Sequence, residues 1–229
     1  MLTIIGWIMG FTASAIILST TIFGLLSLYH AKKSKAKLLG VAGLAVFFMG
    51  LIYIGPFIDF LLVVTTTNNL TPNNLYVLIS YSFVAPGLIF AMYLGAELLT
   101  PKAKKLIIIF YAILGVIFEV LLWTDTNQIF AFSVANGLID TSFNVLHPLF
   151  FVVVIILGSV FVFLGCGFLI KVLQSTGQVK KKFIYLSIGF FVFAVCGALE
   201  SLIEPSVYTG IVRLIMTSFP IWVYLGLKP

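Results

Sequence analysis

The residues best placed to do chemistry in this sequence are ionisable side chains within strongly apolar runs. Arg213 is the single arginine among 13 basic residues, and it lies about one helical turn inside such a run. Two acids, Glu200 and Glu204, precede it across a short turn that contains Pro205. Because an ionised group in lipid costs several kcal/mol, we expect Arg213 to face the interior of a helical bundle and to pair with Glu200, Glu204 or Asp59.

Acids on three other apolar runs fall in the same layer of the membrane as Arg213, when each run is counted at about 1.5 Å per residue. One interpretation is an ion pair that clamps the second, sixth and seventh runs together. The other is a polar pocket for a cation, an amine or a ligand of mixed polarity. The residues of this predicted network are Asp59, Glu119, Glu200, Glu204 and Arg213, with Asp140 and His147 at the rim of a pocket.

Glu119 has no basic residue near it in its own run. A carboxyl kept protonated by desolvation is one interpretation. Membership of the same network is the other, and we favour it.

The remaining residues exclude most catalytic chemistry. The sequence has no Ser/His/Asp grouping, no phosphate-binding loop and no Glu-x-x-His pair, so we expect neither an enzyme nor a cofactor. His147 precedes Pro148 and is expected to start a helix rather than to hold a metal. Cys166 and Cys196 lie inside apolar runs, which argues against a disulfide or a metal motif. The last run has no lysine before Lys228, so a covalently bound retinal is excluded.

The composition indicates an integral membrane protein whose main partner is the lipid bilayer. Hydrophobic residues make up 62% of the 229 residues and charged residues 9%, with a mean hydropathy of +1.22. A spanning helix needs about 20 apolar residues, so the runs predict an all-α membrane protein, a single domain over 1–229 with seven transmembrane helices. The expected spans are 3–29, 38–64, 75–99, 106–123, 147–173, 183–203 and 210–227.

The lysines predict the orientation of the chain. They lie near the loops after the first, third and fifth spans and at Lys228, whereas the opposite loops contain none. The positive-inside rule therefore places the N-terminus outside and the lysine-rich face in the cytoplasm. We expect a multi-pass protein of the plasma membrane, with a separate signalling partner at that face. Lysine clusters without interleaved aromatic residues do not predict nucleic-acid binding.

The order of the spans suggests an internal repeat. Residues 1–99 and 145–229 would form two parallel three-helix units, joined by a linker helix at 106–124. Similar short motifs recur in spans three and seven, although apolar helices also produce such matches by chance. The outer segment 125–144 is too apolar for a simple loop. We expect it to form a short interfacial helix or a cap folded over the end of the bundle.

Two stretches carry a resemblance to a known family. Residues 86–95 (PGLIFAMYLG) and 121–130 (LLWTDTNQIF), together with the basic loop and glycine-rich start of span six, resemble the seven-helix N-terminal membrane sensor region of histidine kinases. That family often has a histidine shortly after the Thr-Asn pair, where this chain has Gln128. The resemblance implies ligand sensing at the outer face. It covers the membrane sensor region and not the kinase domain of that family. The three-one-three layout is also similar to that of SWEET-type sugar transporters.

These observations leave three functional hypotheses. The first is a stand-alone sensor or receptor-like protein that binds a small ligand from outside. The second is a small-solute transporter of the three-one-three type, and the third is an accessory subunit of a membrane complex.

Overall fold

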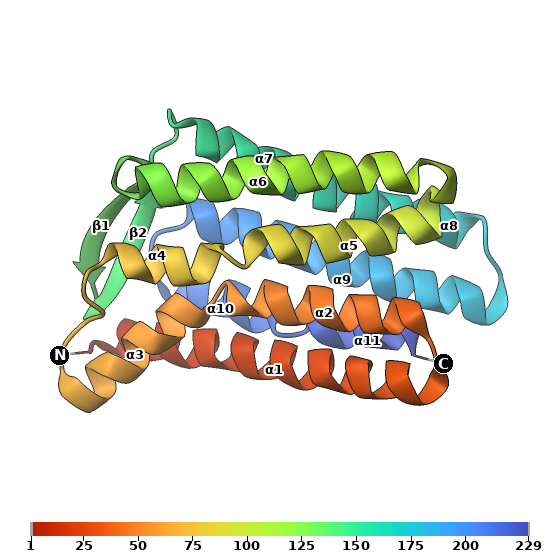
Figure 1. The fold of residues 1–229 in the computed structure, drawn as a ribbon. Coiled ribbons are helices and arrows are strands. Elements are labelled where there is room, and N and C mark those ends of the chain that lie inside the picture. The colour runs from red at the N-terminus through yellow and green to blue at the C-terminus, as the bar shows by residue number, and fades with distance from the viewer. Residues whose placement is uncertain (1, 229) are drawn as a thin grey trace.

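The long apolar runs fold into helices, because a bilayer offers no partners for backbone N–H and C=O groups and a helix pairs them internally. The computed structural model describes residues 2–228 and is 81% helical, so the all-α class is confirmed. Six helical segments in this range are long and apolar enough to cross a membrane. There are seven if α2 (Lys37–Leu51) and α3 (Ile54–Thr66), which are bent by 46°, count as one span. The segments lie side by side in one bundle (Figure 1).

Some of the other spans are continuous and some are interrupted. The continuous ones are α1 (Ile4–Ser34), α6 (Lys104–Ile129), which follows the short turn η1 (Pro101–Ala103), and α9 (Gly177–Leu202). The interrupted ones are α4 (Asn74–Tyr81) with α5 (Val84–Leu99), α7 (Pro148–Ser159) with the π-helical segment η2 (Val160–Cys166) and α8 (Gly167–Leu173), and α10 (Val207–Met216) with α11 (Phe219–Leu227).

Three spans break because of proline. The breaks between α2 and α3, α4 and α5, and α10 and α11 each fall two to four residues before Pro56, Pro86 or Pro220. Proline has no N–H to donate to the carbonyl four residues earlier, and its ring clashes with that carbonyl. Side chains satisfy part of the exposed backbone. The Ser19 hydroxyl of α1, for example, donates to the Thr217 carbonyl at 2.7 Å.

The segment after α6 forms a β-hairpin. The predicted interfacial helix is therefore wrong, and the segment forms the other predicted arrangement, a cap on the end of the bundle. Strands β1 (Phe130–Ala135) and β2 (Leu138–Phe143) pair in antiparallel register, from Phe130 opposite Phe143 to Ala135 opposite Leu138. The turn residues Asn136 and Gly137 have φ angles of 58° and 88°, as a tight hairpin turn requires. The hairpin lies across one end of the bundle (Figure 1).

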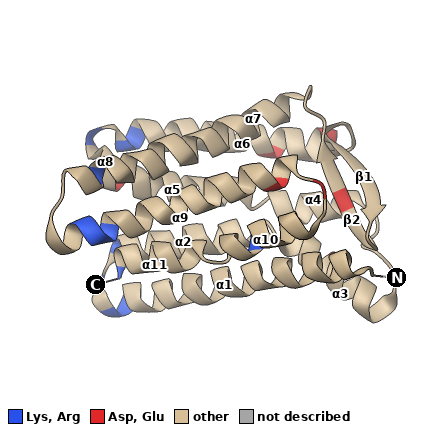
Figure 2. Ribbon diagram, turned by 180° about the vertical axis from the view of Figure 1, so that it is seen from behind, with Lys and Arg blue, Asp and Glu red and all other residues tan. Residues whose placement is uncertain are grey.

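The charges are separated between the two ends of the bundle. Figure 2 shows the lysines gathered at the end opposite the hairpin, while most of the acidic residues lie toward the hairpin. Helix α1 starts beside the hairpin and α11 finishes at the lysine-rich end (Figure 1), an arrangement that an odd number of crossings produces.

The hairpin turn gives a test of the cap. A β-branched residue at a position of positive φ costs about 1–2 kcal/mol, so Gly137→Val is expected to lower the free energy of unfolding by about that amount. Gly137→Asn is the matched control, since asparagine tolerates positive φ. Thermal unfolding of the purified protein in detergent measures both variants. Equal melting temperatures of Gly137→Val and Gly137→Asn would show that a β-branched side chain causes no strain at this turn.

Candidate functional site

Arg213 reaches the bundle interior because the turn before α10 fixes the start of that helix. The Ser206 hydroxyl accepts from the Thr209 N–H at 3.4 Å, and the Thr209 hydroxyl donates to the Glu204 carbonyl at 2.8 Å. Thr209, Arg213 and Met216 then share one buried face of α10, because they are three or four residues apart. The Arg213 residue is 7% exposed.

Arg213 forms a buried ion pair with Glu200 of α9. Its Nε donates to Oε1 of Glu200 at 2.7 Å, and its Nη2 lies 2.6 Å from the same oxygen. Its Nη1 donates to the backbone carbonyl of Met9 in α1 at 3.1 Å. Of the three acids predicted as partners for Arg213, Glu200 is therefore the one that binds it.

Tyr53, at the break between α2 and α3, completes this group. Its hydroxyl donates to Oε2 of Glu200 and lies 3.0 Å from the sulfur of Met216. Its ring centre lies 5.5 Å from Cζ of Arg213, close enough for a cation–π interaction. Arg213, Glu200 and Tyr53, named here the Arg213 cluster, thus connect α1, the α2–α3 break, α9 and α10.

Asp59 of α3 is fully buried, and backbone N–H groups rather than Arg213 bind its carboxylate. Oδ1 accepts from the Leu70 N–H and Oδ2 from the Ile139 N–H, both at 2.8 Å. Asn69 Nδ2 donates to the two carboxylate oxygens at 3.2 and 3.3 Å and to the Gly137 carbonyl at 3.2 Å. Such hydrogen bonds stabilise a carboxylate without a cation. The predicted option of an Asp59–Arg213 pair is therefore wrong, and Asp59 fastens the hairpin to α3.

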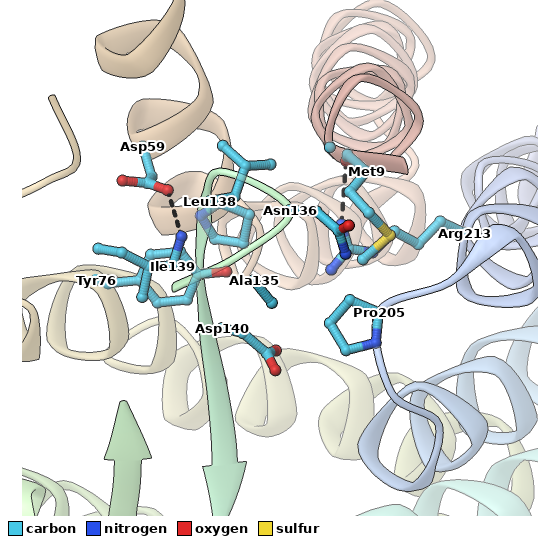
Figure 3. A pocket seen from close by; sticks show the side chains of 12 residues that line it. Met9, Asp59, Tyr76, Ala135, Asn136, Leu138, Ile139, Asp140, Pro205 and Arg213 are labelled. Atoms are coloured by element: carbon cyan, nitrogen blue, oxygen red, sulfur yellow. Dashed lines mark hydrogen bonds between the residues drawn. The ribbon is translucent and has the colours of Figure 1, made fainter. Parts of the chain in front are cut away.

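A small cavity separates Asp59 from the Arg213 cluster and lies under the hairpin. Figure 3 shows Asp59 and Arg213 on opposite sides of it, with Asp140 of β2 between them. Its volume is about 40 Å³, enough for a few water molecules or a small ion. Arg213 uses three N–H groups on Glu200 and Met9. Because a guanidinium has five N–H donors, two remain for a molecule in the cavity.

The other predicted site residues are divided between different places. Asp140 lines the cavity, and burial raises the pKa of its carboxyl above the ordinary value. His147 caps α7, because its Nδ1 accepts from the Leu149 N–H at 3.2 Å, and its Nε2 lies 3.7 Å from Asp125. The predicted rim of Asp140 and His147 therefore does not form as one unit. The side chain of Glu204 is exposed to solvent. Residues 2–228 contain no group of three side chains that could hold a metal.

Glu119 also lies outside the cavity, so its predicted membership of the same network is wrong. It lines a separate hollow between α6 and the α4–α5 span. Its Oε1 is buried and has no hydrogen-bond partner among the described residues.

Three uncharged contributors to the site were not predicted, namely Tyr53, Asn69 and the Asn136–Gly137 turn. The dipeptide Asn-Gly between the apolar runs 130–135 and 138–143 is a strong hairpin signal, and it could have revealed the turn. Tyr53 stands three residues before Pro56, which marks a helix break but not a hydrogen bond to an acid. No sequence pattern identifies Asn69 as a partner of Asp59.

The ion pair predicts strong coupling between its two residues. Arg213→Met or Glu200→Leu alone leaves one buried charge without a partner, and we expect each to cost about 3–5 kcal/mol of unfolding free energy. The double variant leaves neither charge and should recover most of that loss. Denaturant titration of the four proteins in detergent measures the coupling. A double variant whose loss equals the sum of the single losses would show that the pair is not coupled.

The Asp59 contacts predict a local effect on the cap. In Asp59→Asn the amide nitrogen cannot accept from a backbone N–H, so either Leu70 or Ile139 loses its partner. A buried N–H without a partner costs about 1–3 kcal/mol, and we expect faster hydrogen exchange across β1 and β2 than in the unmodified protein. Exchange mass spectrometry measures this, with the core of α9 as internal reference. Unchanged protection of the hairpin would contradict the fastening role of Asp59.

Comparison with known proteins gives no family assignment: no family model matches the sequence, and no curated protein matches it.

Proposed function

We propose that this chain is a sensor or receptor-like membrane protein that binds a small polar ligand from the outer side, in the cavity beneath the hairpin. The observation that carries the proposal is that a buried cation and two acids line one cavity at the bundle end opposite the lysines. The positive-inside rule would place that end outside the cell and the lysines in the cytoplasm. The lysine-rich face is then the surface at which a separate signalling partner would dock.

The chemistry of the cavity favours a ligand of mixed polarity. Two N–H groups of Arg213 are unused by protein acceptors and would bind an anionic or acceptor group. Asp140 would bind an amine or another donor, since its carboxyl lines the same cavity. A small zwitterion such as an amino acid presents both kinds of group.

A ligand larger than a few water molecules requires the hairpin to lift. At its turn, the hairpin is attached by a small number of hydrogen bonds. The Thr3 N–H and hydroxyl bond to Asn136 at 3.3 and 3.0 Å, and Asp59 and Asn69 hold Ile139 and Gly137. Opening would release the ends of α1 and α3, and Arg213 connects the same cavity to α9 and α10. Ligand binding would thus bias the relative positions of several helices, as a sensor requires.

A second candidate, a small-solute transporter, is favoured by the three proline breaks. Transporters place substrate sites at discontinuous helices near the middle of the membrane. Here the cavity is confined to the hairpin end, and apolar side chains fill the bundle beyond the Arg213 cluster, among them Ala13, Ile16, Ala45 and Met49. This filling favours the sensor.

The proposal predicts saturable binding that depends on Asp140. A panel of amino acids, amines and carboxylates is titrated into the purified protein and followed by calorimetry. For the compound that binds best, Asp140→Asn should weaken binding about tenfold or more, because it removes one charge-assisted hydrogen bond. Glu204→Gln is the matched control, since Glu204 is exposed and does not line the cavity.

Two results would contradict the sensor. Equal affinity of the unmodified protein and the Asp140→Asn variant would show that the compound does not bind in the cavity. Flux of the bound compound into proteoliposomes, abolished by Asp140→Asn, would support the transporter instead.

A further inference from the structure

A second hollow, distinct from the cavity under the hairpin, lies on the side of the bundle. It has a volume of about 390 Å³ and lies between α6 and the α4–α5 span. Ser82, Pro86, Gly115, Val116 and Glu119 are among the residues that line it. Val116 is 63% exposed on an apolar span, so the hollow opens toward lipid rather than toward water.

The hollow follows from a proline break beside small residues. Pro86 follows the interruption of the α4–α5 span, and α6 passes that span at Gly115, where an added Cβ would lie 3.1 Å from the Cβ of Ala85. The two helices therefore touch at Gly115 and Ala85. The small side chains around that contact leave the adjoining space unfilled.

The polar groups of this hollow are acceptors with too few donors. Oε1 of Glu119 is buried and has no hydrogen-bond partner among residues 2–228, and the indole of Trp123 is the side chain that can donate to the same carboxyl. Pro86 has no N–H, so the Ser82 carbonyl lacks its ordinary helical donor. The Ser82 hydroxyl is already used, because it donates to the Leu78 carbonyl at 2.7 Å. A molecule that satisfies these groups must bring N–H or O–H donors.

We propose that this hollow, named here the Glu119 groove, binds an amphiphilic amine from the membrane. The ammonium group would donate to the Glu119 carboxyl and to the Ser82 carbonyl, and the apolar part would lie against Pro86 and Val116. An amine fits better than an alcohol, because it can take up the proton of a desolvated carboxyl and then pair, as a cation, with the resulting carboxylate. An acid would add another acceptor to a site that already has too few donors.

The dimensions and charges of the groove favour a small molecule over a helix. Its volume lies within the range of about 300–1,000 Å³ that small-molecule sites occupy. Along α6 it extends from Ala112 to Val120, about 12 Å, which is far shorter than the contact of two spanning helices. A second copy of the chain would offer no free cation at this depth, because its Arg213 is paired with Glu200.

The test uses the full chain in phosphatidylcholine nanodiscs with dodecylamine as the probe and dodecanoate, of equal chain length, as its counterpart. Native mass spectrometry counts the bound molecules and follows the titration, and tryptophan fluorescence, to which Trp123 contributes with Trp7 and Trp222, supports it. We expect one saturable dodecylamine site, at least tenfold weaker binding in Glu119→Gln, and no saturable site for dodecanoate. Glu97→Gln is the matched control, because Glu97 pairs with Lys104 at 2.7 Å outside the groove.

A second variant keeps the test decisive if Glu119→Gln does not fold. Val116→Trp starts from an exposed position, retains the carboxyl and fills the groove, and it should abolish saturable binding. The proposal is overturned if dodecylamine binds both groove variants as it binds the unmodified protein, or if dodecanoate binds equally well. A dimer that forms without amine and is lost in Val116→Trp would also overturn it, since a second copy would then occupy the groove.

Discussion

The arrangement of the bundle depends on one requirement, that the buried charge of Arg213 be neutralised away from water. A buried cation in an apolar medium is tolerated only with a nearby anion and further hydrogen bonds. Glu200 supplies the anion, Met9 a carbonyl and Tyr53 both a hydrogen bond to the anion and an aromatic face. Because these groups come from four segments, the helices cannot rotate or slide independently without leaving a charge unpaired.

The attachment of the hairpin also depends on stabilising a buried charged group, in this case the carboxylate of Asp59. Asp59 is more deeply buried than Arg213, and backbone N–H groups of the loop after α3 and of β2 bind its carboxylate. The hairpin is thereby held by polar contacts over a polar cavity, rather than by an apolar interface alone. A hydrogen bond to the hairpin can be exchanged for one to water or to a ligand at a small net change in free energy. Opening a purely apolar interface would instead expose apolar surface to water, which is unfavourable.

Position along a helix could be predicted from the sequence better than direction around it. Counting residues from the lysine loops predicts that Asp59, Glu119, Glu200 and Arg213 lie toward the end away from the lysines, because each residue of a helix adds a fixed rise. Asp59 and Arg213 line the cavity under the hairpin, and Glu200 binds Arg213. Whether an acid faces Arg213, the hairpin or lipid depends on helix rotation and on breaks. Helices α3 and α6, which carry Asp59 and Glu119, are apolar on most sides, so hydrophobic periodicity does not fix their rotation. Glu119 and Asp59 were misassigned for this reason.

The cavity under the hairpin and the Glu119 groove share an origin in the sequence. Pro56 lines the cavity under the hairpin and Pro86 lines the Glu119 groove, and each stands just after a break in its span. A proline break removes a backbone hydrogen bond and interrupts the regular helix, so it leaves a carbonyl without its helical donor and irregular packing beside it. The ionisable residues then give the two hollows different chemistry. A cation and acids together make the cavity suited to mixed polarity, whereas the groove holds a lone acid and is suited to a donor.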